Sequence, residues 1–172
     1  MNAVHAGQMS ATPSVSVDLQ VVSDAFEMPA EYQIFAWVSN AIEAVSVEES
    51  VGYELAVRLV DEAESQALNK QYRYKDSPTN VLSFPFAQMA GLPADEARPL
   101  GDLVICAPVV LREAAQQGKN AQDHWAHMVI HGTLHLFGYR HETDDQAALM
   151  ETIEKTVLQG FGIENPYTRI DN

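Results

Sequence analysis

Three histidines within residues 131–141 have the spacing of a metal site. His131 and His135 are four residues apart, so on a helix their imidazoles lie one turn apart on the same face and can hold one ion between them. Gly138 predicts the end of that helix, because a residue without a Cβ readily adopts the left-handed conformation common at C-terminal caps. The chain can then turn and bring His141 back as a third ligand. Three neutral nitrogens leave a fourth position open for water or substrate, which is typical of a catalytic rather than a structural zinc.

The same predicted helix carries two further histidines. His124, His127, His131 and His135 are spaced by three, four and four residues and therefore form one stripe. Each helical turn rises about 5.4 Å, so a single ion cannot use all four. His127 fits a supporting or substrate-facing role, or simple burial. For His124 the pattern favours a structural role.

The spacing H-x-x-x-H-x-x-G-x-x-H also matches the metal-binding pattern of the metzincin proteases. In that class a glutamate directly follows the first histidine and serves as the general base. Gly132 stands at this position here. The metal-binding pattern is therefore similar, but peptide hydrolysis would need a base from elsewhere in the chain.

Length, composition and charge indicate one acidic domain. A chain of 172 residues can bury a hydrophobic core without disulfides, and the single cysteine, Cys106, lies in an apolar run that predicts a buried thiol. The net charge of −14, from 10 basic and 24 acidic residues, argues against unselective binding of nucleic acids. No apolar run is long enough to cross a bilayer, and the first dozen residues lack a secretory signal. We therefore expect a cytoplasmic protein without membrane association.

A single basic cluster stands out against this acidic composition. Lys70, Arg73 and Lys75 place three of the ten basic residues within six positions. Such a cluster can hold a phosphate on an otherwise acidic protein. The alternative is a solvated helix end, where cations interact favourably with the helix dipole. Charge alone favours this alternative.

The hydrophobic pattern predicts an α+β domain with a small mixed sheet of about four strands, packed by about five helices of which one carries the metal ligands. Strands are expected over residues 15–22, 53–60, 80–86 and 100–107. Helices are expected over residues 29–46, 62–72, 108–117, 121–137 and 144–159. The expected boundaries are a flexible leader over 1–13, a single metal-dependent hydrolase domain over 14–160 and an irregular tail over 161–172.

Local signals refine four of these elements. Pro85 predicts an edge strand or a strand end, because proline cannot donate to the sheet ladder. Asp61 and Asn120 are expected to cap the helices that follow them. The apolar stripe of the last helix is predicted at Leu149, Ile153 and Val157, which follow one another at intervals of four residues.

Three separated segments carry longer patterns in a fixed order. They are LNKQYR at 68–73 continuing into DSPTNVLSFP at 76–85, LGD at 100–102, and the histidine stretch HGTLHLFGYRH at 131–141, which His127 precedes. They are close to LN-x-x-YR with D-x-PTNVLSFP, to LGD, and to HG-x-LHL-x-GYDH. Together they resemble the YbeY family, the metal-dependent endoribonucleases of ribosomal RNA maturation. Arg140 departs from the family pattern, which usually has aspartate there.

The resemblance implies a ligand set and an activity. It implies one zinc ion per chain held by His131, His135 and His141, with Arg73 and His131 as the catalytic residues. It also implies cleavage of single-stranded RNA in 16S ribosomal RNA 3′-end maturation, and a part in ribosome quality control. Arg140 is not a ligand in the pattern, so the metal prediction does not depend on it.

The chemistry of Arg73 suits this implied role. Phosphodiester cleavage builds negative charge on the non-bridging oxygens, which a forked guanidinium can bind bidentately while a zinc ion acts as Lewis acid or activates water. The alternative for Arg73 is a structural ion pair with Asp76 or Asp102. Asp102 itself fits two roles, orienting a ligand histidine or capping a turn.

We therefore expect a zinc-dependent, single-strand-specific endoribonuclease acting on ribosomal RNA precursors. Two alternatives stay open: a zinc-dependent peptidase or amidohydrolase, and a non-catalytic ribosome-assembly factor whose zinc is structural. Three histidines also suit nickel, copper or iron. The expected partners are the ribosomal RNA precursor and the small ribosomal subunit, with a ribosomal protein or a ribosome-associated GTPase delivering the substrate to this acidic chain.

Overall fold

The computed structural model describes residues 13–47, 51–87, 93 and 96–167, and its centre is a four-stranded mixed sheet, as predicted. The strands are β1 (Val15–Val21), β2 (Tyr53–Val60), β3 (Val81–Pro85) and β4 (Arg98–Cys106). Their spatial order is β1-β2-β4-β3; β1, β2 and β4 run parallel, and β3 pairs antiparallel with β4. Pro85 therefore ends an edge strand, where its missing N–H leaves no ladder bond unmade. The predicted leader lies, except for residue 13, outside the described residues.

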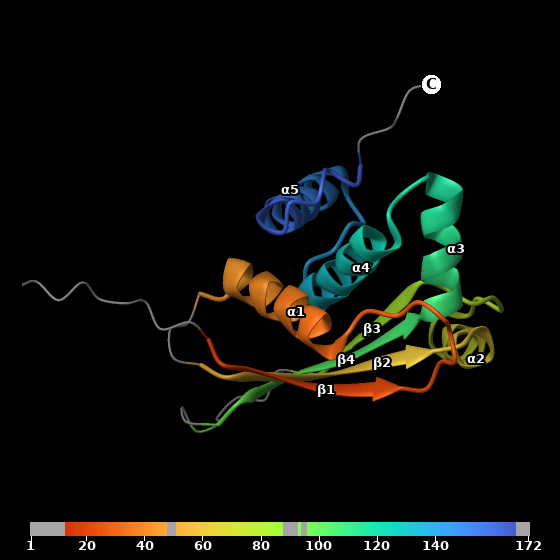
Figure 1. The fold of residues 1–172 in the computed structure, drawn as a ribbon. Helices are drawn as coiled ribbons and strands as arrows, with labels where there is room; N and C mark the ends of the chain where they lie inside the picture. Colours follow the sequence, from red (N-terminus) through yellow and green to blue (C-terminus); the bar gives the residue numbers. More distant parts are fainter. Residues whose placement is uncertain (1–12, 48–50, 88–92, 94–95, 168–172) are drawn as a thin grey trace, which may run out of the picture.

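The described part of the chain has five helices, which pack on the two faces of the sheet, and all five were predicted to within two residues at each end. They are α1 (Glu31–Val45), α2 (Glu62–Arg73), α3 (Ala107–Gln117), α4 (Ala121–Leu136) and α5 (Asp144–Gly160). Figure 1 shows α1 and α4 against one face of the sheet, with α5 on the side of α4 that faces away from the strands. No helix in the described ranges is long and apolar enough to cross a membrane.

Successive residues of β4 point to opposite faces of the sheet and join two different clusters. Leu103 and Ile105 belong to the main hydrophobic core, which is shared with α1, α4 and α5. Val104 and Cys106 belong to a smaller cluster that includes Leu68 of α2, so α2 covers the second face. Cys106 is buried and free, as predicted for a structural thiol.

The helix α4 lies at the centre of the domain and contacts α1, α3, α5, β3 and β4. Gly132 allows its close approach to the sheet, because a Cβ there would stand 3.0 Å from Leu103 and 3.1 Å from Val81. Asn120 caps the start of α4, as predicted, by accepting hydrogen bonds from the N–H groups of Gln122 and Asp123. The helix is thus fixed at its start and along its length.

Two predictions of local detail were wrong. Asp61 stands at the N-cap position of α2, but its side chain makes no capping bond and accepts a hydrogen bond from Ser23 instead. Leu149 was predicted in the apolar stripe of the last helix, yet it is 56% exposed. The buried residues of α5 are Met150, Glu154, Val157 and Leu158. The buried face is therefore rotated by about one residue from the predicted one, since the stripe pattern alone fits both faces.

The strand β4 contains a bulge at the position where β3 comes closest. Glu54 pairs with Pro99 and Leu55 pairs with Gly101, which leaves one extra residue on β4. Gly101 has φ +139°, and a Cβ there would lie 2.2 Å from the carbonyl oxygen of Phe84. Glycine is required at this position by both the backbone angle and the contact.

The substitution Gly101→Ala is expected to lower the free energy of unfolding by about 2 kcal/mol or more, because both the φ angle and the clash with a backbone oxygen oppose a side chain. Urea denaturation measures this. Gly160→Ala is the matched control, since nothing lies within 4 Å of a Cβ there. Equal stability of the two variants would contradict the proposed role of the bulge.

Candidate metal centre

The three predicted ligands come together at the C-terminal end of α4. One ring nitrogen from each of His131, His135 and His141 lies within 4.8 Å of the others. The Nε2 atoms of His131 and His135 face each other at 3.0 Å. Two nitrogens bound to one tetrahedral zinc at about 2.0–2.1 Å would lie roughly 3.3 Å apart. The donor set and its spacing therefore fit a metal ion.

The turn after α4 both ends the helix and orients one ligand. Gly138 has φ +95°, its N–H donates to the carbonyl of His135, and the N–H of Tyr139 donates to the carbonyl of Leu134, which together form a Schellman cap. The carbonyl of Tyr139 lies 2.7 Å from Nδ1 of His135. A carbonyl can only accept, so Nδ1 carries the proton and Nε2 is free to bind a metal. The same turn leads to His141.

Burial determines the charge of His135. Burial lowers its pKa, and repulsion between its protonated form and the neighbouring imidazoles of His131 and His141 lowers it further, to about 4. The imidazole is therefore neutral at pH 7, which is the form that binds metals.

A buried carboxylate that the sequence analysis did not identify supports the first ligand. Glu154 of α5 is fully buried, and its Oε1 lies 2.7 Å from Nδ1 of His131. Burial raises the pKa of Glu154, but hydrogen bonds from His127 and His131 outweigh burial and lower the pKa to about 2. The ionised carboxylate can only accept, so Nδ1 of His131 carries the proton and Nε2 faces the other ligands.

A signal for Glu154 existed in the sequence. It lies one turn after Met150 and one turn before Leu158, both of which are buried on α5. A carboxylate between apolar residues on a buried helix face needs a partner inside the protein. The predicted stripe through Leu149 placed Glu154 off the buried face, so this signal was missed.

The two further histidines of α4 are both buried and take different partners. His127 has its Nε2 2.6 Å from Oε2 of Glu154, so it supports the same carboxylate as His131 and does not face a substrate. Burial lowers the pKa of His127, which the neighbouring carboxylate partly offsets. His124 has its Nε2 3.2 Å from Glu113 of α3, which agrees with the structural role predicted for it.

Asp102 does not orient a ligand histidine. It precedes Leu103, which faces α4, so its side chain lies on the opposite side of the sheet, toward α2. No hydrogen bond or ion pair joins it to a histidine in the described ranges. Glu154 takes the supporting role that was considered for Asp102.

Arg73 ends α2 at the edge of the sheet, with an exposed side chain. Its Nη2 donates to the carbonyl of Ser83 at 3.4 Å, and the hydroxyl of Ser83 donates to the carbonyl of Gly132, which adjoins His131. Arg73 makes no ion pair within the described part of the chain, and Asp76 pairs with Lys70 instead. One residue of β3 thus connects the arginine with the ligand helix, and the guanidinium keeps free donors.

The structure explains the glycine at the metzincin base position. The Cβ position of Gly132 points at the side chains of Leu103 and Val81, so a glutamate there would have to displace both of them. Arg140, where the family pattern has aspartate, is exposed and is not among the grouped ligand residues.

Known proteins of one family are similar to this chain. The family model described as Endoribonuclease YbeY matches residues 20–162. The protein named Endoribonuclease YbeY from Halorhodospira halophila is 54% identical over 139 residues, covering 81% of this chain and 88% of its own length. Those of the same name from Colwellia psychrerythraea and Alkalilimnicola ehrlichii are 50% and 51% identical and cover 88% and 92% of this chain, and 96% and 94% of their own lengths.

A solved structure supports the fold. The solution structure of a Thermotoga maritima protein matches with a TM-score of 0.53 and 23% identity, covering 90% of this chain and 100% of that one. At this identity it bears on the fold alone. The family model and the relatives at about half identity confirm the resemblance seen in the sequence: the chain belongs to the Endoribonuclease YbeY family.

Proposed function

We propose that this chain is an endoribonuclease that uses one zinc ion to cleave single-stranded ribosomal RNA precursors, at the 3′ end of 16S ribosomal RNA. The observation that carries the proposal is the convergence of three histidine nitrogens at the C-terminal end of α4, the helix that Ser83 links to Arg73. The relatives are named endoribonucleases, which supports the reaction class. A cytoplasmic location agrees with a single, free cysteine.

Three neutral imidazoles with an open position are the ligand set of catalytic zinc sites. When bound, zinc supplies a Lewis acid for a phosphoryl oxygen or activates a water molecule. The side chain of His131 is 18% exposed and His141 is exposed, so the centre opens to solvent. This exposure favours a catalytic site over the closed site of a structural zinc, and the packed glycine at position 132 disfavours a metzincin-type peptidase.

Arg73 and Glu154 have different roles in the proposed cleavage of the phosphodiester. Arg73 would hold non-bridging oxygens with the donors that Ser83 does not use, and its charge does not depend on pH. Glu154 keeps the Nε2 of His131 directed toward the metal position. Because these groups are fixed before substrate binds, they stabilise developing charge without further reorganisation.

Replacing a ligand is expected to remove both metal and activity. His135→Ala should weaken zinc binding more than about 100-fold, because a lost ligand costs more than a lost supporting partner. Zinc content and cleavage of a labelled single-stranded ribosomal RNA precursor would be measured on identically purified proteins. Gln159→Ala, an exposed change on α5, is the control. Unchanged cleavage by a folded, zinc-free His135→Ala protein would refute the metal-dependent mechanism.

The arginine is expected to act on the transition state more than on folding. Arg73→Ala should lower kcat by about 100-fold, as removal of a preorganised charge donor does, with the unfolding free energy nearly unchanged. Arg73→Lys should restore part of the rate, because a lysine supplies the charge without the fork. Lys70→Ala, which removes an exposed cation paired with Asp76, is the matched control. Equal losses in the Arg73→Ala and Lys70→Ala proteins would assign the effect to general charge.

We further propose that a ribosomal protein or a ribosome-associated GTPase delivers the RNA, on the small ribosomal subunit. The net charge of −14 opposes binding of a free polyanion, and only a small basic cluster offsets it. Precursor RNA within small-subunit particles should therefore be cleaved at least about tenfold faster than the same free RNA at physiological salt. Cleavage time courses on the two substrates at equal RNA concentration measure this difference. Equal cleavage rates would contradict the proposal that a partner delivers the RNA.

A further inference from the structure

Residues 161–167, the C-terminal segment, turn back against the helices after α5. The backbone reverses at Gly162, whose φ is +73°, and Ile163 packs against the main hydrophobic core. Lys119, which follows α3, donates from Nζ to the carbonyl of Pro166 at 2.9 Å. A segment that has no helix or strand is therefore attached to the body of the domain at both ends.

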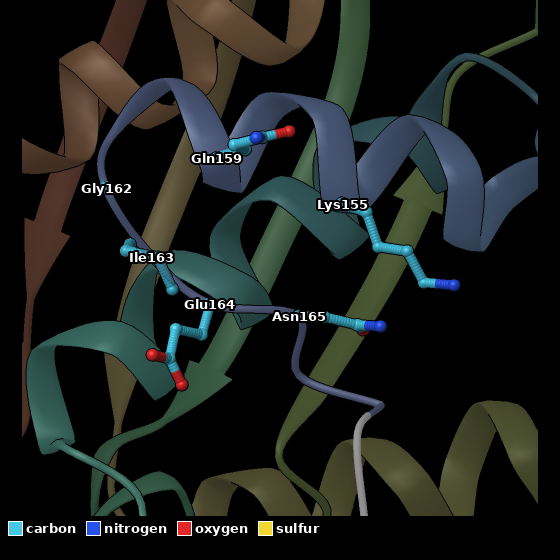
Figure 2. A pocket seen from close by; sticks show the side chains of 6 residues that line it. All are labelled: Lys155, Gln159, Gly162, Ile163, Glu164 and Asn165. Carbon is cyan, nitrogen blue, oxygen red and sulfur yellow. The ribbon is translucent and has the colours of Figure 1, made fainter.

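A hollow of about 500 Å³ separates part of this segment from α5 (Figure 2). It is lined by Lys155, Gln159, Gly162, Ile163, Glu164 and Asn165. None of these residues is a predicted metal ligand, so the hollow is separate from the histidine site. Because the segment is not packed tightly along the hollow, its attachment depends on the contacts on either side of it.

The last described residue of the segment reaches the support of the metal site. The hydroxyl of Tyr167 donates to Oε2 of Glu154 and lies 3.1 Å from Nε2 of His127. The two rings meet edge to face with centroids 5.3 Å apart. Asn165 accepts a hydrogen bond from the N–H of Tyr167 and so orients the backbone that presents the ring. Burial raises the pKa of Tyr167, as does the neighbouring carboxylate, so the hydroxyl stays a neutral donor.

The two carboxylate oxygens of Glu154 have different partners, and this difference indicates what Tyr167 does. Oε1 meets His131, whereas Oε2 meets both His127 and Tyr167. A carboxylate is planar and rigid, so a group that fixes Oε2 also fixes the direction of Oε1. Without the tyrosine hydroxyl, Oε2 would keep a single protein donor and the carboxylate could rotate about its Cγ–Cδ bond.

We propose that Tyr167 is a positioning residue of the metal centre, which acts through Glu154 to hold His131 in the orientation that ligates the metal. The proposal rests on the proposed function only in that the three histidines bind a metal. It makes the C-terminal segment part of the site, although Tyr167 is distant from the ligands in sequence. Tyr167 is not a catalytic residue, because it contacts neither the metal position nor a substrate.

The test compares Tyr167→Phe with Tyr32→Phe in the full chain. Tyr32 lies on α1 and is 75% exposed, so its hydroxyl has no part in the site. Tyr167→Phe keeps the ring and removes only the donor, and at 38% exposure the change leaves the fold intact. Zinc affinity would be measured by competition with a chromophoric chelator, and ligand geometry by the visible absorption spectrum of the cobalt-loaded proteins. Glu154→Gln is the reference for direct loss of support.

Tyr167→Phe is expected to weaken zinc binding about threefold to tenfold, below the 10–100-fold typical of a direct supporting partner such as Glu154. Its cobalt spectrum should shift, and kcat for RNA should fall while KM stays unchanged. Tyr32→Phe should match the wild type in zinc affinity, cobalt spectrum, kcat and KM.

Equal zinc affinity and an unshifted cobalt spectrum in Tyr167→Phe would overturn the proposal and leave the tyrosine as an anchor of the segment. The outcome is separable from that of the proposed function. A wild type that binds zinc without cleaving RNA would refute the nuclease, while the affinity and spectrum would still decide the role of Tyr167. A wild type that binds no zinc would overturn both.

Discussion

The buried carboxylate of Glu154 is the group on which the geometry of the proposed metal centre depends. A fully buried anion is costly unless every oxygen has a donor, and here His131, His127 and Tyr167 supply them. The requirement is mutual, because a histidine on a helix packed from several sides also needs an acceptor inside the protein. Docking of α5 onto α4 therefore satisfies two otherwise unfavourable groups at once, and it couples the packing of α5 to the geometry of the site.

The helix α4 serves as both the centre of the core and the carrier of the ligands, and two glycines make this possible. Gly132 removes the side chain where the helix meets Leu103 and Val81, so the ligand His131 next to it is fixed against the sheet. Gly138 reverses the chain without strain and lets the Tyr139 carbonyl orient His135. The site owes its rigidity to these packing and capping contacts, which exist before any metal binds.

Local patterns carried most of what the sequence could predict. Helical spacing and a glycine cap were sufficient to predict that His131, His135 and His141 come together, and the strands and helices follow from periodicity and turn residues. The partners Glu154 and Tyr167 were not predictable in this way, because no local pattern joins them to His131. Glu154 contacts His131 from 23 positions along the chain, and Tyr167, 13 positions further on, acts on it only through Glu154. The apolar stripe of α5 fitted two adjacent faces, and only packing against α4 selected the face that buries Glu154.

The charge distribution bears on how such a site selects its substrate. Affinity for RNA grows with the number of phosphates that cations neutralise, and the cluster around Arg73 offers few on a chain of net charge −14. Electrostatic repulsion by the acidic protein weakens the binding of every RNA to the same degree. It therefore favours one RNA over another only when a partner raises the local concentration of that RNA. On the proposed function, the acidic composition and the small number of cations have the same effect, which is weak binding of free RNA. A nuclease that binds free RNA poorly cleaves chiefly what is brought to it, and its specificity then resides in the delivery and not in recognition of bases by the site.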